Sequence, residues 1–240
     1  MSEITPEDRR KGVATVEGRR FVYLHPGWVR LWHWINVVLI ILLAATGFSL
    51  HFGGESSGLL SFRTARLVHN ACGWIVLFTF VLYLVGLIVS GEWRQFLVFK
   101  KGFVRGMFIQ TGFYLSGIFR GQPHPDSPTR ERKFNPLQQI TYLLVVVVGL
   151  PLIILTGMML LLPESAPKQV MGAGGIWPIA MAHTVVGYGL VAFMLGHMYL
   201  TTLGHSAWSN ILGMFTGWTE EPEHESPEPP AGEEKEPGDG

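Results

Sequence analysis

The stretch from Met181 to Leu203, MAHTVVGYGLVAFMLGHMYLTTL, is a long apolar segment that carries two histidines, His183 and His197. On an α-helix their fourteen-residue spacing is just under four turns, so both imidazoles leave the same face, about 21 Å apart along the axis. A histidine inside a membrane helix is costly and by default marks a functional site. Two on one face, one near each membrane surface, predict two stacked cofactors.

The composition places this stretch in a membrane protein. Of the 240 residues, 48% are hydrophobic and only 15% are charged, which is unusual for a soluble domain. A helix needs about 20 apolar residues to cross a bilayer. The segments that satisfy this length rule are Trp28–Leu50, Leu67–Ser90, Ile140–Leu162 and Ile179–Leu203. The predicted fold is therefore an all-α integral membrane bundle of four transmembrane helices.

Cysteine usage and the N-terminus exclude several classes of protein. The single cysteine, Cys72, rules out an internal disulfide, an iron–sulfur cluster bound by this chain alone and the C-x-x-C-H attachment of c-type haem. The first twenty residues are polar, and no short apolar core precedes a small-residue cleavage site. We therefore expect the first span to remain as an anchor.

Lysine and arginine are concentrated in two of the segments that flank the spans. Five precede residue 21 and eight lie between the second and third spans, whereas the other two loops hold three together. Cytoplasmic loops carry the excess of basic residues in membrane proteins. This distribution predicts that both termini are cytoplasmic.

Three regions follow from the patterning. Residues 1–20 form a polar, loosely ordered segment, residues 21–218 form the membrane domain, and residues 219–240 form a Glu-, Pro- and Gly-rich tail expected to be disordered. Between the second and third spans, Phe96–Phe119 mixes bulky apolar and basic residues, which suits a segment on the membrane surface. Pro151 predicts a kink in the third span.

A weak internal repeat relates the two halves. ATGF at Ala45–Phe48 matches LTGM at Leu155–Met158, and HNACGW at His69–Trp74 matches HTVVGY at His183–Tyr188. Two helical hairpins related by a parallel repeat would give this pattern. Chance similarity among apolar helices is the alternative.

The first two spans each supply a histidine near their start, His33 and His69. With the N-terminus inside, the depths pair His33 with His197 near the cytoplasm and His69 with His183 near the periplasm. Each pair is a candidate bis-imidazole ligand set for a b-type haem iron. The alternatives are satisfied core histidines, or a zinc site, which would need cysteine or carboxylate ligands that these spans lack. The remaining histidines, expected at structural or surface positions, are His25, His51, His124, His205 and His224.

Glycines and arginines near the histidines favour haem over a bare metal ion. Gly73 and Gly187 each follow a histidine by four residues, where a missing side chain lets a flat macrocycle approach the backbone. Arg30 and Arg66 each precede a histidine by three residues, where a guanidinium could meet a haem propionate. Snorkelling of these arginines to the interface is the alternative.

Three motifs carry a family resemblance. WHW at Trp32–Trp34, R-x-x-H-N at Arg66–Asn70 and KFNPLQQ at Lys133–Gln139 resemble the small dihaem cytochrome b family. This family includes the formate dehydrogenase gamma subunit, the thiosulfate reductase cytochrome b subunit and the nickel–iron hydrogenase cytochrome b. The resemblance covers Phe21–Trp218.

The resemblance implies a subunit of the bacterial inner membrane that anchors an iron–sulfur subunit and a molybdenum or hydrogenase catalytic subunit. Such subunits pass electrons through two non-covalent b haems to or from a menaquinone-type quinone near the cytoplasmic haem. The family's quinone pocket contains a glutamine that matches Gln138, with Asn135 beside it. A helix start with proline in its first turn is the alternative role for Asn135–Pro136. No nucleic-acid partner is expected.

The leading functional hypothesis is thus a dihaem cytochrome b that couples a periplasmic redox partner to the quinone pool. A stand-alone quinol-oxidising cytochrome b that reduces a small oxidant is the second hypothesis. A non-redox anchor or transporter that keeps only the helices is the third.

Overall fold

The fold is described from a computed structural model, which covers residues 4–16, 18–53, 60–96, 102–122, 125, 134–203 and 208–220. Four of its helices are long and apolar enough to cross a membrane, which confirms the predicted spans. They are α2 (Gly27–Phe52), α3 (Phe62–Ser90), the third span (Pro136–Leu161) and α7 (Ile176–Thr201). His124, His205 and His224 lie outside the described residues.

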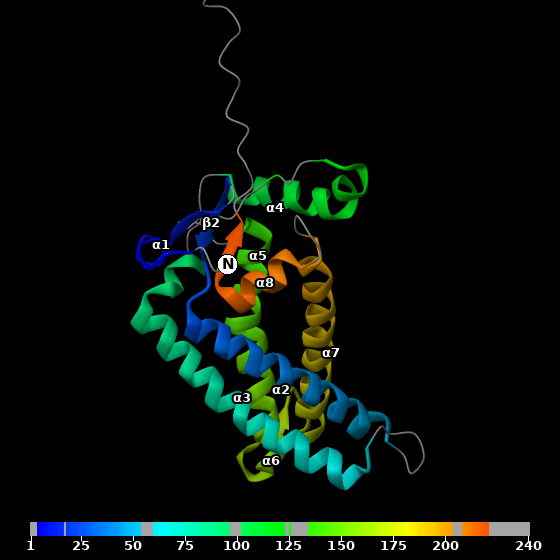
Figure 1. The fold of residues 1–240 in the computed structure, drawn as a ribbon. Coiled ribbons are helices and arrows are strands. Elements are labelled where there is room, and N and C mark those ends of the chain that lie inside the picture. Colours follow the sequence, from blue (N-terminus) through cyan, green and yellow to red (C-terminus); the bar gives the residue numbers. More distant parts are fainter. Residues whose placement is uncertain are drawn as a thin grey trace, which may run out of the picture.

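Helices α2 and α3 form an antiparallel hairpin, the blue and teal helices of Figure 1. Leu39, Cys72 and Val76 form a buried cluster between them, against which Ile154 of the third span also packs. Helix α7 packs chiefly on the third span and buries only Ile179. We call the end where α2 begins and α7 ends the N-terminal end, and the opposite end the far end.

The third span is a continuous helix with a wide turn in its middle. It consists of α5 (Pro136–Leu144), the π-helical turn η4 (Val145–Gly149) and α6 (Leu150–Leu161). Pro151, predicted to kink this span, lies directly after the π turn. Proline cannot donate a backbone hydrogen bond to the preceding turn, and an i→i+5 turn is one way to accommodate that loss.

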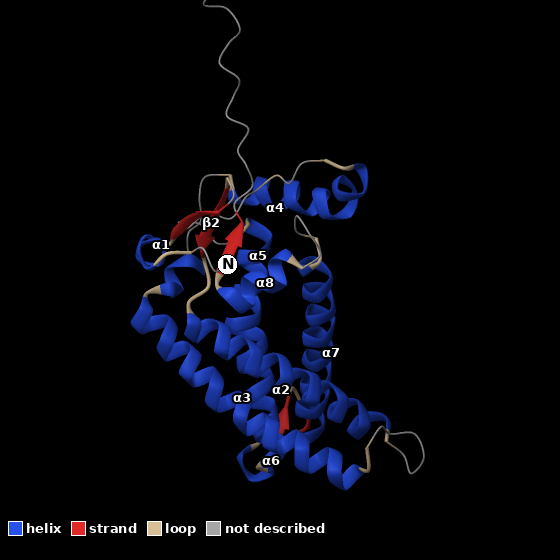
Figure 2. Ribbon diagram, in the orientation of Figure 1, coloured by secondary structure: helices blue, strands red, loops and turns tan. Residues whose placement is uncertain are grey.

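A small sheet joins the two ends of the described chain, and it was not predicted. Strand β2 (Arg19–Tyr23) pairs with β1 (Val13–Val16) on one side and with β5 (Trp218–Glu220) on the other, in antiparallel register (Figure 2). Helix α1 (Pro6–Lys11) precedes the sheet and begins with a capping box between Thr5 and Asp8. These hydrogen bonds from Thr5 lower the pKa of the Asp8 carboxyl.

The expectation of a loosely ordered segment over residues 1–20 is therefore wrong for residues 4–16 and 18–20. Ile4, Ala14 and Trp218 share a buried cluster, so apolar side chains from both ends of the chain hold this segment. The predicted tail, 219–240, begins within β5, and residues 221–240 lie outside the described part of the chain.

Short elements cover both ends of the bundle. At the N-terminal end lie η1 (Glu92–Phe96), α8 (Ser209–Thr216) and a helical segment made of α4 (Phe103–Gly112), η2 (Phe113–Gly117) and η3 (Ile118–Arg120). The α4 segment lies crosswise to α7 (Figure 1) and exposes Val104, Phe108 and Phe119, as a helix on a membrane surface would. The far end carries η5 (Pro163–Ser165) and the hairpin of β3 (Gln169–Val170) and β4 (Ala173–Gly174).

Candidate functional site

The four membrane histidines lie in two pairs, one towards each end of the bundle. At the N-terminal end, the ring centroids of His33 on α2 and His197 on α7 are 6.3 Å apart, with 67° between the ring planes. At the far end, the centroids of His69 on α3 and His183 on α7 are 6.2 Å apart, at 71°. These are the partners that the depths of the residues predict.

The separation of the rings fits one iron between each pair. A metal–imidazole bond is about 2 Å long and the ring nitrogen lies about 1 Å from the centroid, so two trans imidazoles have centroids about 6 Å apart. Among the described residues, no three His, Cys, Asp or Glu side chains come together to hold a metal ion. Two protein ligands per site suit a haem, whose macrocycle supplies the other four.

At the far end, each histidine is held by a threonine from a neighbouring helix. Thr46 Oγ1 lies 2.9 Å from His69 Nδ1, and Thr156 Oγ1 lies 3.0 Å from His183 Nδ1. The two hydroxyls donate their protons to the carbonyls of Leu42 and Leu152, both at 2.7 Å. The threonine oxygen must then accept from Nδ1–H, which leaves Nε2 with a lone pair to bind a metal.

A glycine follows each of these threonines and lets the ring approach the helix. A Cβ atom at Gly157 would lie 3.1 Å from His183 Cε1, and one at Gly47 would lie 3.5 Å from His69 Cε1. Each Thr-Gly pair thus forms a cradle for one histidine. These four residues were not predicted as site residues, although ATGF and LTGM stood out as a repeat; the repeat was the signal that could have identified them.

Removal of either threonine hydroxyl should raise the midpoint potential of a haem bound by the far-end pair, without changing the potential of any haem bound at the N-terminal end. In Thr46→Val, His69 keeps only its hydrogen bond to the Leu43 backbone, loses the threonine oxygen as an acceptor and becomes a less basic ligand, which would stabilise ferrous over ferric iron. Thr156→Val should act on the same potential, because both threonines serve the far-end pair. Redox titration of the two variants measures the shift.

Thr141→Val is the matched control, since that hydroxyl bonds only the Leu137 carbonyl of its own helix. Shifts in two different potentials for Thr46→Val and Thr156→Val would contradict the shared site.

The N-terminal-end pair is surrounded by aromatic rings. His197 stacks on Phe193 at 5.9 Å and meets Tyr142 of α5 at 6.2 Å, and His33 meets Trp34 edge-on at 5.1 Å. His33 Nδ1 is buried and has no hydrogen-bond partner in the described structure. Buried polar atoms normally have a hydrogen-bond partner. The His33 ring is held by packing alone, which is consistent with a residue that binds a further group.

The two predicted glycines lie beside open or loosely contacted space. A Cβ atom at Gly73 would meet no atom within 4 Å, and one at Gly187 would meet only Ile153 Cδ1, at 3.9 Å. Protein side chains therefore do not fill the faces of α3 and α7 next to His69 and His183. This arrangement can accept a flat macrocycle.

The predicted arginines have different surroundings. Arg30 donates from its guanidinium to the Phe215 carbonyl of α8, and its Nε is buried without a partner. Trp34, one turn further along α2, stacks on Phe215 at 4.2 Å, so Arg30 and Trp34 together dock α8 on α2. Arg66 is exposed at the start of α3.

Asn135 and Gln138, the predicted quinone residues, form the capping box of α5. The Asn135 Oδ1 atom accepts from Gln138 N at 2.8 Å, and Gln138 Oε1 accepts from Asn135 N at 3.2 Å. The alternative role of Asn135–Pro136 as a helix start is thus confirmed. The capping box occupies the Gln138 oxygen and does not use its amide N–H groups.

A buried polar network lies around this cap. Asn135 Nδ2 donates to the Tyr114 hydroxyl at 3.3 Å, and Gln110, which is 1% exposed, is hydrogen-bonded to the same hydroxyl. Burial raises the pKa of the Tyr114 phenol, which therefore keeps its proton near neutral pH. The network links α4 and η2 to Asn135 at the start of α5, about two helical turns before Tyr142, the residue that meets His197.

The model of the prokaryotic cytochrome b561 family matches residues 24–217 of the chain. This range includes all four paired histidines and both Thr-Gly cradles. The chain belongs to the prokaryotic cytochrome b561 family. It is consequently a membrane cytochrome b that functions in electron transfer, and its family binds b-type haem.

Named relatives of this cytochrome b come from several bacteria. The putative cytochrome YdhU of Escherichia coli K12 is 33% identical over 213 residues, covering 88% of this chain and 80% of the relative. A probable Ni/Fe-hydrogenase B-type cytochrome subunit of Rhizobium leguminosarum bv. viciae is 26% identical, covering 76% and 81%. The putative protein-methionine-sulfoxide reductase subunit YedZ1 of Azospira oryzae is 24% identical, covering 75% and 90%.

Proposed function

We propose that this cytochrome b holds two b haems, one between His69 and His183 and one between His33 and His197. It transfers electrons through them between a redox partner and a quinone. The observation that carries the proposal is the presence of two imidazole pairs at 6.2 and 6.3 Å, at opposite ends of one four-helix bundle. A bound haem supplies reversible one-electron chemistry. The protein fixes the ligand rings, supplies apolar surroundings and sets the distance between the two sites.

The positions of both sites on α7 give the route across the membrane. His183 and His197 are separated by about 21 Å of helix, most of a hydrocarbon core of about 30 Å. In this proposal Arg66 would meet a haem propionate, as would Arg30 through the guanidinium nitrogens that its bond to Phe215 leaves free. The open space beside Gly73 and Gly187 supports a macrocycle at the far end. Each haem then lies close to one membrane surface, so that electrons exchange with different partners at the two ends.

The far end suits a redox partner, and the N-terminal end suits a quinone. By the distribution of Lys and Arg, both termini lie in the cytoplasm and the far end faces the periplasm of the bacterial inner membrane. Two of the relatives are named as subunits of a hydrogenase and a reductase. This supports a docked iron–sulfur subunit and a catalytic subunit here, and it favours the coupled cytochrome over a stand-alone quinol oxidase.

The quinone site of the proposal is the buried polar cap at the start of α5. Gln138 precedes Tyr142 by one turn on the same face of α5, and Tyr142 meets His197. An amide N–H of Gln138 donates to the quinone carbonyl, while Asn135 and Tyr114 fix the amide in place.

Haem stoichiometry tests the proposal directly. The purified protein should contain two haems per chain, both extractable without cleavage of a covalent bond, and both low-spin because each iron has two imidazole ligands. A pyridine haemochrome assay with quantitative amino-acid analysis measures the ratio. One haem per chain, or a covalently attached haem, would refute it.

A further inference from the structure

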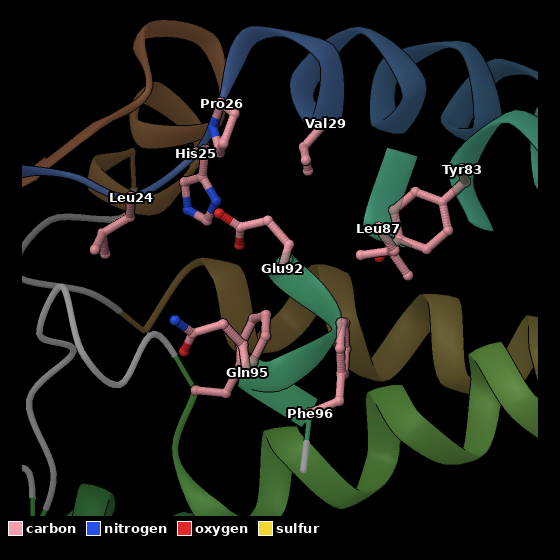
Figure 3. A pocket seen from close by; sticks show the side chains of 10 residues that line it. Leu24, His25, Pro26, Val29, Tyr83, Leu87, Glu92, Gln95 and Phe96 are labelled. Carbon is pink, nitrogen blue, oxygen red and sulfur yellow. The ribbon is translucent and has the colours of Figure 1, made fainter. Parts of the chain in front are cut away.

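A small pocket at the N-terminal end contains an acid–base pair that the proposed electron route does not use. His25 precedes α2, and Glu92 begins η1 directly after α3; both are partly buried and both line the pocket. Figure 3 shows the Glu92 carboxylate and the His25 imidazole facing one another across it, with Gln95 beneath them. The pocket is bounded on its inner side by Tyr83, Phe96 and Phe134.

The pocket has the size of a water site and not of a quinone site. Its volume is about 40 Å³. A buried water needs roughly 10–15 Å³, so the pocket has room for about three waters and is too small for a ring of quinone size. Waters beside a carboxylate and an imidazole form a hydrogen-bonded chain along which protons move.

Three aromatic rings in series connect this pocket to the cytochrome's N-terminal-end histidines. Phe96 packs on Phe134 at 5.4 Å, Phe134 on Tyr142 at 5.2 Å, and Tyr142 meets His197 at 6.2 Å. Phe134 also immediately precedes Asn135 in the chain. Because Phe134 lines the pocket, the pocket adjoins the start of α5, where the proposed quinone amide lies.

The backbone holds the pair in place. The amides of Leu24 and His25 both donate to the carbonyl of Gly217, at 2.9 and 3.3 Å. Gly217 has a positive φ of 89°, and a Cβ atom there would lie 2.8 Å from the His25 carbonyl oxygen. The turn at Gly217, between α8 and β5, thus fixes the position of His25 opposite Glu92.

We propose that His25 and Glu92 are the proton-transfer pair that connects the proposed quinone site to the aqueous phase at the N-terminal end. Reduction of one quinone takes two electrons through the N-terminal-end haem and two protons. Each proton passes from solvent to Glu92 or His25, then through pocket water to a quinone oxygen, and the pair is reprotonated from solvent. Quinol oxidation runs the same steps in reverse, so no other co-reactant is required.

The other charged or titratable groups around the pair have separate roles. Tyr83 lines the pocket but stacks on Trp32 at 3.9 Å. Arg94 of η1 lies over the Trp93 ring, at 5.4 Å, and Arg30 of α2 donates to the Phe215 carbonyl. Neither arginine lines the pocket, and the Tyr83 ring is held in an aromatic stack, so the proposal assigns proton transfer to the Glu92 carboxylate and the His25 imidazole.

The experiment uses the haem-loaded protein in proteoliposomes with a menaquinone analogue and an artificial electron donor. Glu92→Gln and His25→Ala should each keep both haems and their spectra but reduce quinone-linked turnover about 100-fold, the scale of lost acid–base catalysis. Added imidazole should restore turnover in His25→Ala. Infrared difference spectra on reduction, which do not depend on turnover, should lose a carboxyl band in Glu92→Gln.

Glu164→Gln and His51→Ala are the matched controls, because both residues are exposed at the far end. Normal turnover in Glu92→Gln and His25→Ala would refute the proton-transfer role of the two residues. A carboxyl band that survives in Glu92→Gln would refute it as well. A loss in His25→Ala that imidazole does not restore assigns His25 a structural role and also overturns it. The inference rests on the proposed quinone function; if the wild type shows no quinone-linked turnover, that function fails first.

Discussion

His69→Ala is expected to remove one of the two proposed haems completely and to leave the other with its normal spectrum. The reason is geometric: His69 faces His183 at 6.2 Å, and no other described imidazole shares that pair. Without His69 the far-end site would offer a haem iron only one imidazole, and we expect this to be too little to hold the haem. His33→Ala should have the opposite result and remove only the N-terminal-end haem.

Redox titration of the purified variants distinguishes the two sites, because a different midpoint potential should disappear in each. His51→Ala is the control at the far end: it is an exposed histidine on α2 whose ring meets Tyr188 at 6.0 Å, yet it has no histidine partner. If His69→Ala and His33→Ala removed the same potential, or if either kept both, the pairing of the histidines would be wrong.

Gln138→Leu is expected to reduce quinone-linked turnover at least about tenfold while both haems remain. The substitution removes the amide that donates to the quinone carbonyl, and it also removes the acceptor that caps Asn135 N. Loss of such a cap costs about 1 kcal/mol of helix stability, too little to unfold the bundle. Haem content measured beside turnover separates the two effects.

Gln138→Glu isolates the donor. Glutamate at the third position keeps the capping box, because its carboxylate accepts from the Asn135 amide as the glutamine oxygen does. A carboxylate cannot donate to a quinone, so turnover should fall as far as in Gln138→Leu. Wild-type turnover in Gln138→Glu, with a loss in Gln138→Leu, would show that Gln138 acts only as a helix cap.

The side of the membrane from which protons are taken up determines whether turnover conserves energy. Quinone reduction at the N-terminal end, with electrons arriving from the far end, moves one charge across the membrane per electron. Each charge works against about 2.3 kcal/mol per 100 mV of membrane potential. Turnover that conserves energy therefore requires the quinone and its proton supply to lie at the end opposite the redox partner.

The sequence was sufficient for the spans and for the histidine pairs. Apolar length identified each span, and the spacing of His183 and His197 placed two sites on one helix face. Depth then selected their partners, because a straight bundle brings residues of equal depth together. The capping box at Asn135 was also predictable, since its residue types sit at fixed offsets.

Contacts between distant segments were not predictable in the same way. The sheet needs Arg19–Tyr23 to meet Trp218–Glu220, and neither segment has a strand signal long enough to specify a partner across the whole chain. The docking of Arg30 on Phe215 depends on where α8 lies, and local sequence does not contain that information. Thr46 and Thr156 were visible as a repeat, but only the cross-helix distances assign them to the histidines.

The two Thr-Gly cradles lie at matching positions of the internal repeat in the sequence. If each hairpin descends from one ancestral hairpin, Thr46 corresponds to Thr156 and His69 to His183, so the far-end pair lies on the two-fold axis that relates the copies. His197 follows His183 by fourteen residues, and the residue at that distance from His69 is Tyr83.

His33 precedes Thr46 by thirteen residues, and with the residue added by the π turn its counterpart before Thr156 is Tyr142. The pair formed by His33 and His197 therefore lies off the axis. The position related to it by the two-fold axis holds Tyr83 and Tyr142, which belong to one cluster. On this ancestry the bundle has one histidine pair on its axis and a second on only one side, and the symmetry-related position holds an aromatic cluster instead of a third pair.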